Sequence, residues 1–258
     1  MGEEYTFGDN DRASVRLRKL AELYAPDTHD LLEKHRAAAH LAVDLGCGPG
    51  WCTDLLNRVL SPSRSVGLDS SDRYIAKARE RFPNVEFQVH NIADPGFPVD
   101  RPDFLFCRFL LTHFADPAGV LRTWASIAAP GARLVVHETE GLEAEHPALR
   151  RYYELVDELQ GHYGQDLYLG ARLDECFEQT PWKVIESVRR EMEKPAALMA
   201  ELHLDNLITL RSDPYAQQTF DHREMDWLEE SLGRISSGTE DGGVVLNAAR
   251  QIAADLPG

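Results

Sequence analysis

Between residues 41 and 138 the chain alternates short, continuously apolar runs with longer amphipathic stretches. The apolar runs contain many β-branched and aromatic residues, which is typical of strands buried on both faces. A helix is predicted behind Asp116, which can cap it, because Pro117 fits a first helical turn. Strand and helix repeated in this way predict a parallel sheet with helices on both faces. The five predicted strands are Leu41–Leu45, Ser65–Asp69, Val85–Val89, Asp103–Arg108 and Arg133–Glu138.

The pattern changes outside this region, where amphipathic segments dominate. We expect a capping box at Asp221 and Glu224, because this spacing lets two side chains satisfy the first amides of a helix. The further predicted helices are Arg12–Tyr24, Ala148–Gln160, Tyr168–Glu178, Pro195–Leu210 and Asp221–Ile235, and the further predicted strands are Trp182–Arg190 and Val244–Ala248.

These elements together predict a doubly wound α/β fold with a mostly parallel, seven-stranded, Rossmann-like sheet and helical cover insertions. We expect one domain over residues 1–258. Its core is predicted at about 37–140, 167–190 and 243–252, and its helical cover at about 1–30, 141–166 and 192–238.

Composition narrows the possible functions. The 258 residues include 27 basic and 43 acidic side chains, a formal net charge of −16. Such a surface repels phosphate-rich partners, so we expect no nucleic acid substrate. No apolar run approaches the roughly 20 residues that a membrane span needs, and we expect a soluble cytoplasmic protein without a membrane partner. The four cysteines are scattered, which favours reduced, packed thiols over disulfides or a metal site.

A glycine-rich bend follows the first predicted strand, in the run Asp44-Leu45-Gly46-Cys47-Gly48-Pro49-Gly50. Glycines let the backbone adopt positive φ and pass close to a ligand, and the next helix presents unpaired amide donors. A dinucleotide fingerprint would need a third glycine where this chain has Trp51, and a P-loop would need a Gly-Lys-Ser/Thr ending that is absent. The bend resembles motif I of class I S-adenosylmethionine-dependent methyltransferases, and the outer segments resemble a bacterial small-molecule subgroup.

The resemblance implies S-adenosylmethionine as cofactor and S-adenosylhomocysteine as product. Asp69 closes the second strand, where a carboxylate can accept hydrogen bonds from both ribose hydroxyls. At the corner after the third strand the family carries an Asp that holds the adenine amino group, and the matching residue here is Asn91. The other cofactor contacts that the resemblance implies come from Gly46, Cys47, Gly48, Gly50, Ser70, Ile92 and Arg108.

On the first predicted helix, Arg16-Leu17 matches an Arg-Leu pair whose arginine lies on the cofactor carboxylate in relatives of this subgroup. An arginine fork suits a carboxylate. Alternatively, Arg16 is a surface residue and Arg18 takes this role. Tyr5, further upstream, would close over the same end of the cofactor.

Methyl transfer from a sulfonium is an in-line displacement, so the protein mainly aligns the reacting atoms and excludes water. It needs no metal, and the sequence shows no metal-ligand motif. An oxygen or carbon acceptor benefits from a base. The catalytic candidates are His113 after the fourth strand, Tyr24 on the first helix and Asp166 between two helices. Their structural alternatives are pocket lining, core packing and helix capping respectively.

Four more residues are candidates for the walls of an acceptor pocket. His137 and Glu138 end the fifth strand and would reach the cavity, unless Glu138 caps a helix. His203 and Asn206 fall on one face of the predicted 195–210 helix among apolar residues, which indicates either a pocket wall or a hydrogen-bonded core histidine.

We therefore predict a methyltransferase that acts on an O, N or C atom of a small biosynthetic metabolite, as a monomer or homodimer. Two alternatives stay open. One is a protein of the same fold that binds S-adenosylmethionine without methylating. The other is a macromolecule methyltransferase, which the net charge disfavours.

Overall fold

The computed structural model describes residues 11–258, and its core is one sheet of seven strands. The strands are β1 (Leu41–Leu45), β2 (Arg64–Asp69), β3 (Glu86–Val89), β4 (Phe104–Arg108), β5 (Arg133–Ala144), β6 (Lys183–Pro195) and β7 (Val244–Asp255). They are hydrogen-bonded in the order β3-β2-β1-β4-β5-β7-β6, and every pair is parallel except the two pairs that β7 makes. The predicted fold class is confirmed. The predicted role of Tyr5 at the cofactor falls on a residue outside the described part of the chain.

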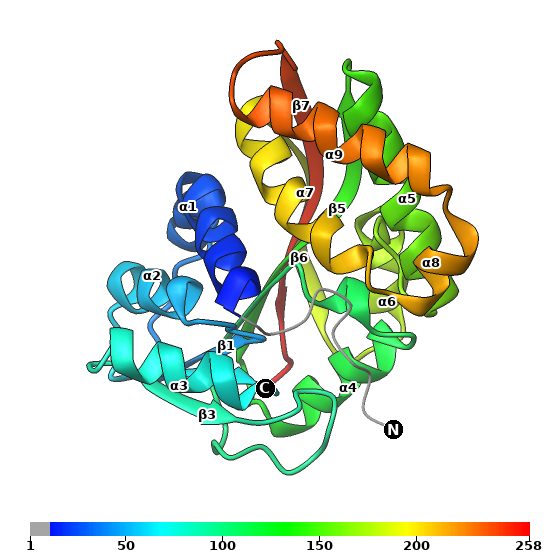
Figure 1. The fold of residues 1–258 in the computed structure, drawn as a ribbon. Helices are drawn as coiled ribbons and strands as arrows, with labels where there is room; N and C mark the ends of the chain where they lie inside the picture. The colour runs from blue at the N-terminus through cyan, green and yellow to red at the C-terminus, as the bar shows by residue number, and fades with distance from the viewer. Residues whose placement is uncertain (1–10) are drawn as a thin grey trace.

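Helices lie on both faces of this sheet (Figure 1). They are α1 (Asp11–Lys34), α2 (Trp51–Leu60), α3 (Asp72–Arg81), α4 (Pro117–Ile127), α5 (Pro147–His162), α6 (Leu173–Glu178), α7 (Ala196–Leu210), α8 (Pro214–Thr219) and α9 (His222–Ser236), with 3-10 turns η1 (Leu111–His113) and η2 (Leu169–Arg172). None of the helices within residues 11–258 is long and apolar enough to span a membrane.

Alternation along β4 shows how the sheet separates two apolar layers. Phe104 and Phe106 pack with α1 and α2 on one face, whereas Leu105 and Cys107 pack with α4 and α6 on the other. Successive strand side chains point to opposite faces, so a strand covered on both sides needs an unbroken apolar run. This is the pattern that predicted the sheet.

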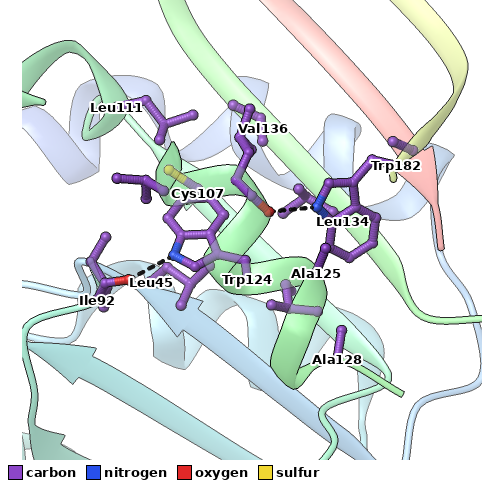
Figure 2. Packing of buried hydrophobic residues seen from close by; sticks show 14 of the residues in the cluster. Leu45, Ile92, Cys107, Leu111, Trp124, Ala125, Ala128, Leu134, Val136 and Trp182 are labelled. Atoms are coloured by element: carbon purple, nitrogen blue, oxygen red, sulfur yellow. Dashed lines mark hydrogen bonds between the residues drawn. The ribbon is translucent and has the colours of Figure 1, made fainter. Parts of the chain in front are cut away.

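Trp124 of α4 lies at the centre of the second layer and is completely buried (Figure 2). Its indole nitrogen donates to the carbonyl oxygen of Ile92 over 2.9 Å. Because the ring fills the core and also satisfies a buried carbonyl, Trp124→Ala is expected to lower the free energy of unfolding by about 3–5 kcal/mol. Urea denaturation measures this loss. The matched control is Trp227→Ala, since Trp227 is 41% exposed on α9, and comparable losses in the two variants would contradict the assignment.

Three strands run well beyond their predicted ends and carry a second layer of helices. β5, β6 and β7 have 12, 13 and 12 residues, and their far halves support α5, α7, α8 and α9, which we call the cover helices (Figure 1). The predicted ends of these strands were wrong. The added residues of β5 and β6 are partly exposed and mix charged with apolar residues, whereas the added residues of β7, 249–255, are mostly buried and pair with 133–139 of β5. Pairing with neighbouring strands determines their length.

Several predicted helices also need correction. α1 continues ten residues past its predicted end, through Pro26, because Leu31 and Leu32 pack under the sheet. The predicted helix over 168–178 divides into η2 and α6. α8 was not predicted, although Asp213-Pro214 is the same start signal as Asp116-Pro117.

The predicted capping box at the start of α9 forms only in part. Asp221 caps the helix by accepting from the amide of Arg223 over 2.7 Å. Glu224 instead forms a two-pronged ion pair with Arg151, over 2.7 and 3.0 Å. A guanidinium fork held in this way fixes α9 against α5, which capping would not do.

Candidate functional site

A cavity of about 400 Å³ lies at the carboxyl ends of β1, β2 and β4, with α1 on one side. It is where strand order reverses in the sheet, the usual place for a ligand in open α/β folds. The predicted site residues that line it are Gly46, Cys47, Gly48, Asp69, Ser70, Arg108 and His113.

The three glycines of the bend serve different purposes. Gly46, Gly48 and Gly50 all have positive φ, at +70°, +52° and +87°. A Cβ on Gly46 would lie 2.5 Å from Leu110, and one on Gly50 would lie 2.8 Å from Phe87. Gly48 has ordinary contact distance to a single side chain and opens onto the cavity. Gly46 and Gly50 therefore allow close packing, while Gly48 leaves room for a ligand.

Asp69 ties the bend to the start of α3. Its two carboxylate oxygens accept from the amides of Gly48 and Ser71, each over 2.9 Å. A carboxylate has about four lone-pair sites, so it can still accept from a ligand's hydroxyls. Asp69 thus fixes the cavity's shape and offers acceptors to its contents.

Asp44, at the end of β1, is a lining residue that the sequence did not single out as a site residue. Its carboxyl is buried and accepts from the Thr53 hydroxyl over 2.7 Å. Burial raises the pKa of Asp44 to about 7, while the nearby Arg108 guanidinium opposes this rise. Arg108 also donates to the Thr28 hydroxyl over 2.6 Å, which anchors it to α1.

The bend after β4 forms the wall opposite the glycines. Phe109 adopts φ of +52°, which costs a non-glycine residue about 1–3 kcal/mol. Its neighbours Leu110 and Leu111 donate their amides to one oxygen of Glu138, each over 2.8 Å. Burial raises the pKa of Glu138 to about 7. This carboxyl group and the His137 carbonyl, which accepts from the Phe109 amide over 2.9 Å, hold the bend from β5.

His113 ends η1 and lines the cavity. Its Nδ1 lies 3.4 Å from Oε1 of Gln165. Burial lowers the pKa of His113 to about 4, with a contribution from the Arg16 charge, so the ring is neutral at pH 7. A neutral imidazole can accept a hydrogen bond or a proton from a bound acceptor, although a low pKa makes it a weak base.

Two of the predicted catalytic residues do not reach the cavity. Tyr24 is buried, with its hydroxyl 4.0 Å from the Met199 sulfur and its ring edge-on to Phe109, so it is a packing residue. Asp166 accepts from the amide of Tyr168 and forms an ion pair with Arg172. Its carboxylate caps a turn, as the structural alternative predicted.

Four predicted cofactor residues also lie outside the cavity lining. Gly50 packs under Phe87 as described above. Arg16 is buried and donates to the Asn206 side chain over 2.6 Å, between α1 and α7. Asn91 is exposed and accepts from the amide of Ala93, and the Ile92 carbonyl is taken by Trp124 (Figure 2).

Of the histidines predicted to line an acceptor pocket, His137 lies on β5 in the sheet and His203 lies on α7, one of the cover helices. His137 is buried against Phe109, with Nδ1 3.4 Å from the Gln251 amide nitrogen. His203 stacks on Tyr152 and contacts the Tyr153 hydroxyl over 3.0 Å. Neither of these histidines lines the cavity.

Sequence reasoning missed most of the apolar lining. Ser71, Phe109 and Leu110 follow strand ends directly, which is a signal that could have found them. On α1 the sequence pointed to Arg16 and Tyr24, whereas Leu17, Leu20 and Ala21 line the cavity, because no short pattern shows which side of this helix faces it. The lining residues missed are Leu17, Leu20, Ala21, Asp44, Pro49, Trp51, Cys52, Ser71, Tyr74, Phe109 and Leu110.

Buried histidines make stability depend on pH. Burial lowers the pKa values of His137 and His203 to about 3. Between pH 6.5 and these values the unfolded chain binds more protons than the folded one, so acid favours unfolding. Asp44 and Glu138 act in the opposite direction, because their raised pKa values keep them protonated in the folded state up to about pH 7.

A single substitution isolates one of these titrations. Between pH 7 and pH 5, wild type is expected to lose about 2 kcal/mol more unfolding free energy than His203→Asn, because the variant lacks one histidine that must charge on unfolding. Urea denaturation at both pH values measures the difference. Equal pH dependence in the two proteins would contradict the neutral, buried state of His203.

The sequence of the chain is similar to those of known methyltransferases. A family model described as a methyltransferase domain matches residues 16–187, about two thirds of the chain. The chain belongs to this family. Methyltransferase-domain relatives include trans-aconitate 2-methyltransferases of Acidovorax ebreus, 36% identical over 138 residues, and of Methylobacterium nodulans, 36% identical over 143 residues. The matches cover 54% and 55% of this chain, which spans about half the length of these relatives, 50% and 55%.

Solved structures show the same fold. A Bacillus halodurans protein, described as a putative methyltransferase, has a TM-score of 0.62 at 14% identity, covering 90% of this chain and all of its own. The cyclase SpnF has a TM-score of 0.57 at 15% identity, covering 91% of this chain and 82% of its own. At such identities the likeness concerns the fold alone.

Proposed function

We propose that the protein transfers the methyl group of S-adenosylmethionine to an O, N or C atom of a small metabolite. The observation that carries this proposal is the β1–α2 bend, where Gly46 and Gly48 at positive φ wall a cavity of about 400 Å³. Asp69 faces that bend from the end of β2. Bare backbone on one side and a carboxylate on the other suit an adenosyl ligand with two ribose hydroxyls.

Each lining residue has a proposed task. The amides of the bend would contact the amino acid part of the cofactor, and Asp69 would accept from the ribose hydroxyls. Ser70 lies next to Asp69 at the same strand end, and Arg108 supplies a cation near Asp44. His113, neutral at pH 7, would accept a hydrogen bond from the acceptor and orient it.

S-adenosylmethionine, when bound, supplies a methyl group already activated on a sulfonium sulfur. In-line attack by an electron pair of the acceptor would leave the carbon–sulfur bonding pair on sulfur and give S-adenosylhomocysteine, while the bend and Asp69 would hold the cofactor in place. The acceptor's proton, where it has one, passes to His113 or to water. The apolar wall of Leu17, Leu20 and Leu110 would exclude water and hold the reacting atoms in line.

We place the acceptor among small biosynthetic metabolites and the enzyme in a bacterial cytoplasm, as monomer or homodimer, without nucleic acid or membrane partners. The net charge of −16 supports a small acceptor over a nucleic acid. Relatives named for trans-aconitate methylation come from bacteria.

Isothermal titration with S-adenosylmethionine and S-adenosylhomocysteine tests the proposal, and absence of binding by both would end it. Fold alone does not establish methyl transfer, as the cyclase with a similar fold illustrates. Formation of S-adenosylhomocysteine with candidate acceptors separates a methyltransferase from a protein that only binds the cofactor.

A further inference from the structure

A buried carboxyl group without a cation partner lies behind the cavity wall. Glu138 is 0% exposed, and no salt bridge to it occurs within residues 11–258. Arg250, its partner across the β5–β7 ladder, pairs with Glu140 over 2.9 Å instead. A buried, unpaired carboxyl is unfavourable unless its hydrogen bonds compensate.

The hydrogen bonds of Glu138 go to one short segment. Its Oε1 accepts from the amides of Leu110 and Leu111, each over 2.8 Å, and the Cys107 sulfur lies 3.7 Å away. Its Oε2 has no hydrogen-bond partner in the described part of the chain. Phe109, immediately before these amides, holds φ of +52°, and its own amide donates to the His137 carbonyl. The backbone therefore turns sharply out of β4 at the point that Glu138 holds.

This segment forms part of the cavity wall. Phe109, Leu110 and His113 line the cavity. The Leu110 side chain occupies the space that a Cβ on Gly46 would need, with 2.5 Å between Cδ2 and the ideal Cβ position. Glu138 therefore binds the backbone of Leu110, and the Leu110 side chain in turn contacts the glycine bend at Gly46. A shift of the amides would move the wall toward or away from the ligand.

We propose that Glu138 is a positioning residue, which holds the Phe109–His113 bend so that Leu110 and His113 face the cofactor and acceptor. The inference rests on the proposed function of the cavity. The role depends on the length of the Glu138 side chain and not on its charge, because the carboxyl group must extend from β5 to the two consecutive amides of Leu110 and Leu111. With a shorter side chain, only a fraction of the molecules would hold the bend in the conformation that binds the ligand. The apparent affinity for the ligand would fall in proportion to that fraction.

Two conservative variants separate reach from charge. Glu138→Gln keeps the length and a carbonyl acceptor, whereas Glu138→Asp keeps the carboxyl group but is one methylene shorter. Amide hydrogen exchange should show Leu110 and Leu111 protected in wild type and Glu138→Gln, and rapidly exchanging in Glu138→Asp. S-adenosylhomocysteine should bind Glu138→Gln within about threefold of wild type and Glu138→Asp at least about tenfold more weakly.

Val135→Ala is the matched control, because Val135 is fully buried on the same strand but faces α1 and α2. It should lower thermal stability while leaving exchange at the bend and ligand affinity unchanged. Wild-type affinity in Glu138→Asp, or equal losses of affinity in Glu138→Asp and Val135→Ala, would overturn the positioning role. Wild-type protein that binds no S-adenosylhomocysteine would instead overturn the proposed function, while the exchange pattern would still report whether Glu138 holds the bend.

Discussion

Gly48→Val is expected to weaken S-adenosylhomocysteine binding about a hundredfold or more. The position has φ of +52°, which a β-branched residue strongly disfavours, and it opens onto the cavity. A valine there would both strain the bend and occupy space that the ligand needs. Isothermal titration measures the loss of affinity, and circular dichroism verifies that the variant is folded.

Gly131→Val is the control for backbone strain. Gly131 also has positive φ, at +78°, but an added Cβ meets no heavy atom within 4 Å, and the residue does not line the cavity. This variant should lose stability without losing affinity. If Gly48→Val binds the ligand as tightly as Gly131→Val does, the bend is not the cofactor site.

Asp69→Ala is expected to reduce the same affinity by about a hundredfold, because it removes two effects at once. The carboxylate holds the Gly48 and Ser71 amides, and we propose that it also accepts from the ribose hydroxyls. Asp69→Asn keeps one carbonyl acceptor and should fall between wild type and the alanine variant. Titration with S-adenosylhomocysteine gives the order of the three proteins.

Asp116→Ala tests whether loss of an aspartate cap explains such an effect. Asp116 is exposed and caps α4 through the Gly119 amide over 2.8 Å, away from the cavity. Its removal should cost about 1 kcal/mol of stability and leave affinity unchanged. An unchanged affinity in Asp69→Ala would show that the ligand's sugar does not lie at the end of β2.

The central part of the fold was predictable because its signals are local. The apolar runs that became β1, β2 and β4 owe their pattern to burial on both faces, and each predicted strand there agrees with the structure within one residue. The glycine bend and Asp69 also follow from position, since residues directly after parallel strands meet at one edge of the sheet. These features needed no knowledge of distant contacts.

Other features depend on tertiary contacts that no short pattern contains. The Ile92 carbonyl is occupied because Trp124 lies opposite it, and Tyr24 is withdrawn from the cavity by Met199 and Phe109. Glu138 was predicted to reach the cavity or cap a helix, but it holds a backbone turn from behind. Such roles are set by which segments become neighbours.

The long strands β5, β6 and β7 have a mechanical consequence. The antiparallel β5–β7 and β6–β7 ladders extend from the part of the sheet beside the cavity to the cover helices, and each ladder has one register shift. A ribbon of three paired strands is stiff, so the cover helices and the catalytic edge of the sheet should move as one rigid body. Access to the cavity would then depend on displacement of α1, which contributes Leu17, Leu20 and Ala21 to its wall.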